Sequence, residues 1–159
     1  MSPKARDLVR QLSMKPHPEG GWYREIYRSP ASVEGAKGRR SALTTIYYLL
    51  EKGQVGRWHV VDADEVWHFY QGAPLELFSY EPISTELARH VLDAPGGGKE
   101  PVAIIGSGVW QASRSLGDYS LVGCGVAPGF EFSDFRFVAD LPGRTAHFEG
   151  PLREWKALL

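Results

Sequence analysis

The segment Gly53–Gly72, with the sequence GQVGRWHVVDADEVWHFYQG, carries the pattern that decides the fold of this chain. It contains two strand candidates, Val55–Val61 and Glu65–Tyr70, which are rich in β-branched and aromatic residues and are joined by an Asp-Ala-Asp turn. His59 falls near the end of the first candidate and Glu65 begins the second. The segment therefore predicts two consecutive β-strands with a histidine and a glutamate on either side of a tight turn.

Further strand candidates follow this pair in both directions along the chain. They are Trp22–Arg28, Leu43–Leu50, Leu75–Tyr80, Ala88–Leu92, Val102–Ile105, Gly108–Ser113, Tyr119–Val126 and Phe130–Val138. Turn residues separate them, and the polar stretch Pro30–Arg39 is predicted to be a loop. About ten short strands at this spacing are typical of an all-β sandwich or barrel.

Helical signals occur only at the two ends of the chain. Ser2 and Pro3 cap a predicted helix over residues 2–14, and Pro16 ends it. The barrel is predicted over about 22–138. A C-terminal extension over 139–159 follows, with a short helix over 152–159 on the barrel exterior. Because no linker or repeat divides the chain, we expect a single domain over 1–159.

The overall composition argues against several classes of partner. The chain has 18 basic and 19 acidic residues, so no charge excess favours nucleic acid or an anionic membrane. No apolar run approaches the length of a membrane-spanning helix. The lone Cys124 excludes a disulfide framework within the chain. We expect a cytoplasmic protein whose partner is a small molecule.

Several motifs together resemble the Cupin-5 family, a cupin domain of unknown function. Gly53–Gly72 matches the cupin signature G-x5-H-x-H-x3-E-x6-G except that Val61 occupies the second histidine position. The other matching motifs, in order, are His17-Pro-Glu-Gly-Gly, Tyr23-Arg-Glu, Tyr27-Arg-Ser, Thr45-Ile-Tyr, Asp64-Glu-Val-Trp-His, Gly72 with Leu75, Val109-Trp-Gln-Ala, Leu121-Val-Gly-Cys-Gly-Val-Ala-Pro-Gly-Phe and Asp134-Phe. The resemblance implies a cupin double-stranded β-helix, or jelly-roll barrel, related in fold to the sugar-nucleotide epimerases. It also implies a homodimer and orients His59 and Glu65 into the barrel.

The departures from the cupin pattern concern the metal ligands. A second cupin motif, P-x-G-x2-H, usually supplies another histidine, and its nearest match here places Gln111 at that position. Zinc and iron sites typically use three or four protein ligands, whereas Val61 is no ligand and an amide oxygen is a weak one. We therefore expect no metal and no cofactor. Any ion that did bind would use His59, Glu65 and Gln111.

His59 and Glu65 are predicted to act as a catalytic acid–base pair. Histidine titrates near the pH at which a general base works best, and a nearby carboxylate fixes its tautomer. This predicts a metal-independent isomerase or epimerase that acts on a sugar-like or nucleotide-like ligand. The alternative is a non-catalytic cupin that binds or senses a small polar or planar molecule. A metal-dependent oxygenase is disfavoured by Val61 and Gln111.

A second set of residues is predicted to contact the ligand. It comprises Gln111, Trp110, Trp67, Tyr47, Glu76 and His68. Aromatic and polar side chains that face inward can line a pocket for a planar or sugar ligand, but aromatic residues also fill small barrels as core. Strand parity places His68 opposite Glu65, so an interface or packing role is its alternative.

Overall fold

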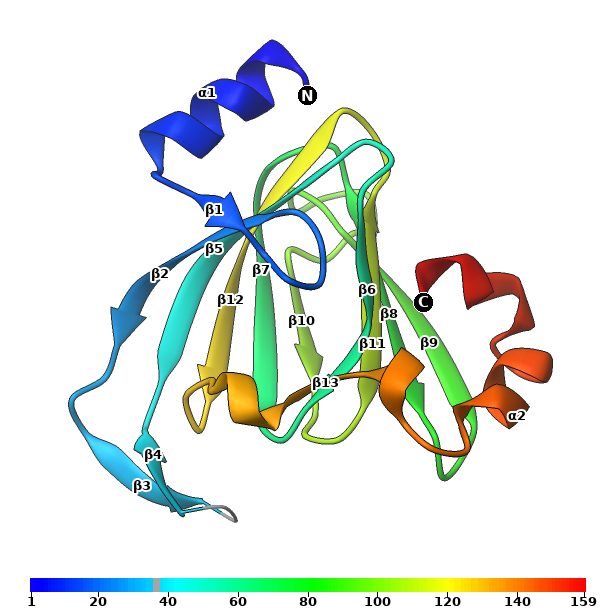
Figure 1. The fold of residues 1–159 in the computed structure, drawn as a ribbon. Helices are drawn as coiled ribbons and strands as arrows, with labels where there is room; N and C mark the ends of the chain where they lie inside the picture. The colour runs from blue at the N-terminus through cyan, green and yellow to red at the C-terminus, as the bar shows by residue number, and fades with distance from the viewer. Residues whose placement is uncertain (36–37) are drawn as a thin grey trace.

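The computed structural model describes residues 1–35 and 38–159, and its main body is a pair of facing antiparallel β-sheets (Figure 1). Within these residues one sheet has the order β1 (Lys15–Pro16), β2 (Trp22–Arg28), β5 (Thr44–Glu51), β12 (Tyr119–Ala127), β7 (Asp64–Gly72) and β10 (Val102–Ile105). The second has the order β13 (Phe135–Phe137), β6 (Val55–Val61), β11 (Trp110–Ser115), β8 (Leu75–Glu81) and β9 (Glu86–Leu92). This arrangement confirms the all-β jelly-roll fold predicted from the sequence.

The turn at residues 62–64 carries the chain from one sheet to the other. The strand that contains His59, β6, belongs to the second sheet, whereas β7 with Glu65 belongs to the first. Pairing of β6 with β11 places Gln111 opposite His59, and pairing of β7 with β12 places Val126 opposite Glu65. The two residues of the signature therefore come from facing walls of the barrel.

The space between the sheets is filled partly by an apolar core. Its fully buried members include Leu50, Leu77 and Val122, which come from both sheets. Tyr48 and Cys124 belong to this core and also line a cavity that continues from it. Apolar side chains therefore fill one part of the space between the sheets, and the cavity occupies another part.

The N-terminal helix α1 (Pro3–Gln11) packs on the outside of the first sheet. Ser2 Oγ accepts a hydrogen bond from Ala5 N at 3.2 Å, which caps the helix as predicted, and buried Ala5 packs in one cluster with Leu49. The helix ends three residues earlier than the predicted boundary. Ser13 adopts a left-handed φ of 51°, which turns the chain into β1.

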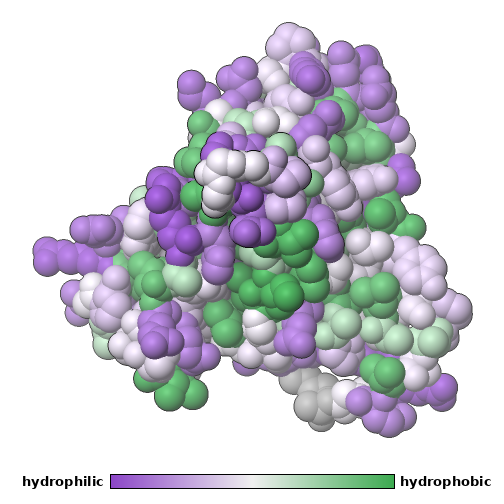
Figure 2. Space-filling view, turned by 180° about the vertical axis from the view of Figure 1, so that it is seen from behind, coloured by the Kyte–Doolittle hydropathy of each residue, from purple (hydrophilic) through white to green (hydrophobic). Residues whose placement is uncertain are grey.

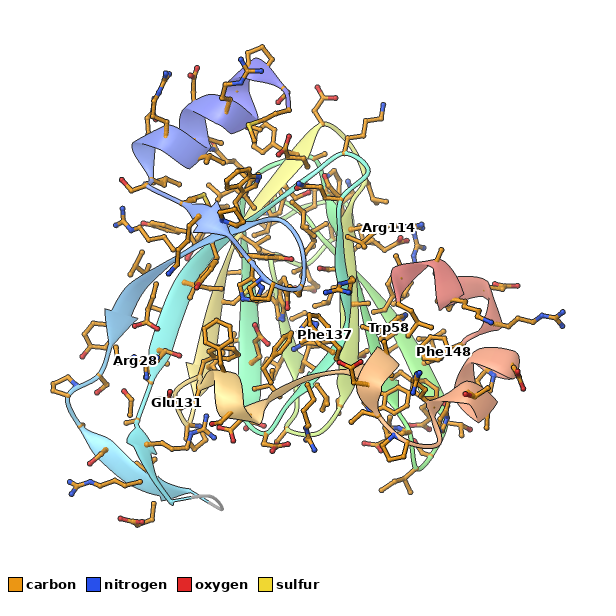
Figure 3. All side chains as sticks on the ribbon, viewed as in Figure 1. Arg28, Trp58, Arg114, Glu131, Phe137 and Phe148 are labelled. Carbon is orange, nitrogen blue, oxygen red and sulfur yellow. The ribbon has the colours of Figure 1, made fainter. Side chains whose placement is uncertain are left out.

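The C-terminal extension covers the outer face of the second sheet. It contains α2 (Arg144–Glu149) and a 3-10 helix over Arg153–Leu158, instead of the single helix predicted over 152–159. Phe148 of α2 joins Trp58 and Trp110 in an apolar cluster, and Figure 3 shows Trp58 and Phe148 between the sheet and these helices.

Two segments differ from the predicted strands and loops. The stretch predicted as one strand over 130–138 instead contains 3-10 helices at Phe132–Asp134 and Val138–Asp140, with β13 between them. The chain bends there as it buries Asp134, whose carboxylate lies 2.8 Å from Arg40. The predicted loop over 30–39 includes a hairpin of β3 (Ser32–Gly35) and β4 (Gly38–Ser41), with residues 36–37 outside the described residues. Most of its side chains are exposed, so hydrophobic alternation gives no sign of pairing.

Two observations concern the outer surface. No helix in the described part of the chain is long and apolar enough to span a membrane. Figure 2 shows apolar side chains gathered near the centre of the rear face and bordered by hydrophilic residues. The predicted homodimer stays a prediction.

Candidate active site

A cavity of about 370 Å³ opens between the two sheets. Its buried part includes His59, Glu65 and Glu19, each less than 9% exposed. Its rim includes Lys15 and Phe132, which are both exposed. The volume lies in the range of small-molecule sites.

His59 on β6 is held in one orientation by its neighbours. Its Nδ1 lies 2.7 Å from the carbonyl oxygen of Arg57, and because a carbonyl can only accept, Nδ1 carries the hydrogen. Its Nε2 lies 3.2 Å from Glu19 Oε2, and its ring stacks on Phe135 with centroids 5.1 Å apart. The free nitrogen of the imidazole therefore faces a carboxyl group.

Glu19 reaches this position because its turn packs directly against the barrel. A Cβ on Gly20, whose φ is 120°, would lie 2.1 Å from Val55 O, so only glycine permits this close approach. The carbonyl of Glu19 accepts from Arg57 N at 3.0 Å, and its own N–H donates to His17 Nδ1 at 3.2 Å. The turn thus places a buried carboxyl beside His59.

The Nε2–Oε2 contact brings His59 and Glu19 close enough to share one proton. Burial lowers the pKa of His59 and raises the pKa of Glu19, so both effects favour the neutral pair. In that state the Glu19 carboxyl donates to Nε2. Because the same contact also accommodates the ion pair, the two groups can exchange a proton without moving.

Glu65 on β7 belongs to a separate chain of hydrogen bonds. Gln111 Nε2 donates to Glu65 Oε2 at 2.6 Å, and Trp67 Nε1 donates to Gln111 Oε1 at 3.1 Å. Burial raises the pKa of Glu65, whereas nearby His59 and the bond from Gln111 oppose that shift. The Cys124 thiol lies beside this carboxyl, and burial raises the pKa of the thiol well above its usual range.

The residues present do not fit the metal centre of the cupin signature. Val61 lines the cavity but has no donor atom, and Gln111 already uses its oxygen to accept from Trp67. Over residues 1–35 and 38–159, no group of three or more His, Cys, Asp or Glu side chains is arranged to hold a metal ion. The polar side chains of the cavity instead contact one another through hydrogen bonds and the His59–Glu19 pair.

The structure brings His59, Glu65, Gln111 and Trp67 together. His59 and Glu65 line the cavity, whereas Gln111 supports Glu65 and Trp67 lies behind it in the core. Glu19 supplies the direct contact to His59, although the sequence prediction did not include it among the site residues. The one signal for it is its place in His17-Pro-Glu-Gly-Gly, where two glycines allow a close approach to the strands.

The other four ligand candidates lie away from the cavity. Trp110 packs under the C-terminal extension, with its ring centroid 5.0 Å from that of His147. Buried Glu76 pairs with Arg89 and Arg114. Tyr47 contacts Tyr70 with ring centroids 6.0 Å apart, and His68 is exposed.

Comparison with protein families identifies the chain. Residues 6–138 match the family model described as Cupin superfamily (DUF985). The chain belongs to this family. A search of curated proteins gives no match.

Two solved structures resemble this cupin along most of their length. A hypothetical protein from Leishmania major is 29% identical with a TM-score of 0.82, and the match covers 94% of this chain and 97% of that one. A protein from Shewanella oneidensis is 34% identical with a TM-score of 0.77, over 89% and 92% of the two chains.

A more distant likeness extends to a larger protein. The capsular polysaccharide assembling protein CapF from Staphylococcus aureus is 16% identical with a TM-score of 0.57. The match covers 78% of this chain and 33% of that one, and it shows the shared fold alone.

Proposed function

We propose that this cupin binds a small sugar-like or nucleotide-like molecule in the cavity and isomerises or epimerises it by metal-independent proton transfer. The observation that carries the proposal is the 3.2 Å contact between His59 Nε2 and Glu19 Oε2 inside the cavity. A buried imidazole and carboxyl that share one proton are suited to general acid–base catalysis. Glu19 thus joins the pair predicted from the sequence.

The positions of the carboxyl groups suggest a division of roles. Burial raises the pKa of Glu65, as it does that of Glu19, and a carboxylate with a raised pKa is the stronger base; the bond from Gln111 holds Glu65 in place for that role. The pair of His59 and Glu19 holds a proton and is suited to act as the acid. Because Glu65 and His59 come from facing sheets, one side can remove a proton from carbon while the other returns one.

Two further considerations bear on the ligand. CapF is named for capsular polysaccharide assembly, which agrees with a sugar-like ligand, but one fold hosts many chemistries. The cavity itself supports the proposal more directly, because aromatic side chains such as Tyr23 and Phe135 line it beside the polar groups. Aromatic walls with a few polar groups are typical of small-molecule sites.

Deuterium incorporation tests the proposal whichever direction the reaction favours. The purified protein is incubated in D₂O with panels of sugars, nucleosides and keto acids, and NMR follows exchange at carbon. We expect exchange into one class of compound by the wild type and its loss in His59→Gln and Glu19→Gln. His68→Gln is the matched control, because His68 is exposed. Binding without exchange in the wild type would favour the non-catalytic alternative.

A further inference from the structure

The charged residues that line the cavity are divided between rim and interior. Glu25 and Glu131 at the rim are both paired with Arg28, at 2.9 Å and 2.7 Å, and Figure 3 shows Arg28 and Glu131 side by side. The two remaining lining carboxyls, Glu19 and Glu65, are buried. The partners of Glu65 are the Gln111 amide and the Cys124 thiol, and those of Glu19 are the His59 imidazole and the Tyr48 hydroxyl.

The cations that line the cavity are Lys15, Arg24 and Arg28, and Arg57 outside the lining acts on Glu19 through its charge. Arg24 lines the cavity, but its Nη1 donates to Leu12 O at 2.8 Å and its guanidinium lies 5.9 Å from the ring centroid of Tyr47. Lys15 is exposed at the rim, with Nζ 5.1 Å from the ring centroid of Tyr23. The three cations of the described lining are thus bonded to other groups or exposed, and none of them is paired with Glu19 or Glu65.

The two buried imidazoles do not supply a fixed positive charge either. Burial lowers the pKa of His17 as well as that of His59. His17 Nδ1 accepts from Glu19 N at 3.2 Å, so this nitrogen carries no hydrogen. An anionic ligand would enter an interior that offers carboxyl oxygens and neutral rings.

Aromatic rings complete the lining. They belong to Tyr23, Tyr48, Phe130, Phe132 and Phe135. Ring faces attract organic cations, and a carboxylate adds a charge-assisted hydrogen bond. The ammonium group of Lys15 already lies over one of these rings, which shows that the mouth accommodates such a group.

We propose that the ligand of this cavity carries a protonated amine or amidine on an otherwise uncharged small skeleton, and that Glu65 receives this group. The inference rests on the proposed function in taking the cavity as the ligand site. It adds the charge class of the ligand, which favours an amino sugar or a nucleoside-like amine over a nucleotide that carries phosphate. The positive charge of Lys15 at the mouth of the cavity would then repel this cationic ligand and weaken its binding.

Two matched series of compounds test this assignment. One consists of benzylamine, benzyl alcohol and benzoate, and the other of glucosamine, glucose and glucuronate; in each, one skeleton carries a cationic, neutral or anionic group. Isothermal titration calorimetry measures binding to the full chain at neutral pH. We expect the amine of at least one series to bind about tenfold or more tightly than its neutral partner, and the anion to bind weakest.

Two variants give opposite expectations for the same amine. Glu65→Gln removes a buried carboxylate and should weaken amine binding about tenfold, whereas the neutral compound changes little. Lys15→Met removes the like charge and should strengthen amine binding. Glu149→Gln and Lys52→Met make the same charge changes at exposed positions outside the lining and are the controls.

Several results would overturn the assignment. They are a preference for the anion, equal affinity within both series, no binding of either amine, or weaker amine binding by Lys15→Met. Since Lys15 is exposed, that variant keeps the test informative if Glu65→Gln fails to fold. Amine binding without deuterium exchange would refute the proposed proton transfer but not the charge class of the ligand. Exchange on a neutral compound that binds as tightly as its amine would refute the charge class but not the proton transfer.

Discussion

The two faces of β6 and β11 carry opposite kinds of side chain. Toward the cavity these strands present His59 and Gln111, which are buried yet polar and bonded to carboxyl groups. Toward the C-terminal extension they present Trp58 and Trp110, which pack among aromatic and aliphatic residues. Neighbouring positions in one strand thus serve the site and the fold separately.

The difference between the faces has an energetic meaning. Burial of an imidazole or carboxyl removes it from water and costs free energy, which only its hydrogen bonds offset. Burial of a tryptophan is favourable by its apolar area. We therefore expect substitutions of the polar side chains on the inner face mainly to change chemistry, and substitutions of the aromatic side chains on the outer face mainly to change stability.

The largest effect is expected from His59→Gln on the inner face. Loss of a positioned acid–base group should lower the rate of deuterium exchange about 10²–10⁴-fold. Urea unfolding should show a much smaller change, because the substitution leaves the outer face intact. Deuterium exchange at the wild-type rate in a folded His59→Gln protein would contradict the assignment of chemistry to the inner face.

The next largest effect is expected from Trp58→Ala on the outer face. Trp58 is fully buried, and its Nε1 donates to Trp155 O at 3.1 Å. Its truncation should lower the free energy of unfolding by about 3–5 kcal/mol, as measured by denaturant titration. Trp58→Phe should cost less, and ligand affinity of the folded protein should stay unchanged. A loss of affinity with little loss of stability would contradict the comparison.

A smaller effect is expected where the inner face is most crowded. A Cβ on Gly56 would lie 2.4 Å from Ser113 Oγ and 3.0 Å from Tyr48 Oη. Gly56→Ala should therefore lower the free energy of unfolding by about 1–3 kcal/mol. Addition of Ser113→Ala should restore part of this loss, because it removes the closest atom. A double-mutant cycle checks the coupling, and strict additivity would show that the contact does not matter.

The smallest effect is expected in the dependence of stability on pH. Burial lowers the pKa values of His17 and His59 below their ordinary value of 6.5, so the unfolded chain binds more protons below that pH. Their contribution to stability should thus fall as the pH falls below 6.5. The pKa values of Glu19 and Glu65 are raised above 4.5, so the folded chain binds more protons than the unfolded chain above that pH. Their contribution to stability should therefore fall as the pH rises above 4.5.

Substitution separates these contributions. Urea titrations across this pH range should give a shallower acid-side loss for His17→Gln than for the wild type. The same titrations of His68→Gln should follow the wild type. If His17→Gln leaves the pH dependence unchanged, the pKa of His17 does not differ between the folded and unfolded states, which would contradict this prediction.

The sequence predicts the fold well because the signals for strands and turns depend on residues that are close together in the chain. The alternation and spacing around Gly53–Gly72 depend on neighbouring residues, as do the turns between the later strands. The end of α1 at Gln11 and the break before β13 depend instead on tertiary structure. At the break, the Arg40–Asp134 pair links distant segments. Such features leave no periodic pattern.

The site is only half predictable for the same reason. His59, Glu65 and Gln111 fall at motif positions, whereas Glu19 meets His59 from a turn forty residues earlier in the chain. Adjacent strand residues face opposite sides, and this separates Trp110 from Gln111. The partners of a buried charge are set by tertiary structure, so they appear only once the turn is placed on the barrel.

The protonation of His59 is the most direct measurement of the proposed chemistry. Long-range ¹H–¹⁵N NMR of the imidazole reports which nitrogen carries the hydrogen and at what pH the ring becomes charged. We predict a neutral ring protonated on Nδ1, a pKa below 6.5, and a change in the Nε2 chemical shift in Glu19→Gln. A hydrogen on Nε2, a pKa at or above 6.5, or a spectrum unaffected by Glu19→Gln would contradict it.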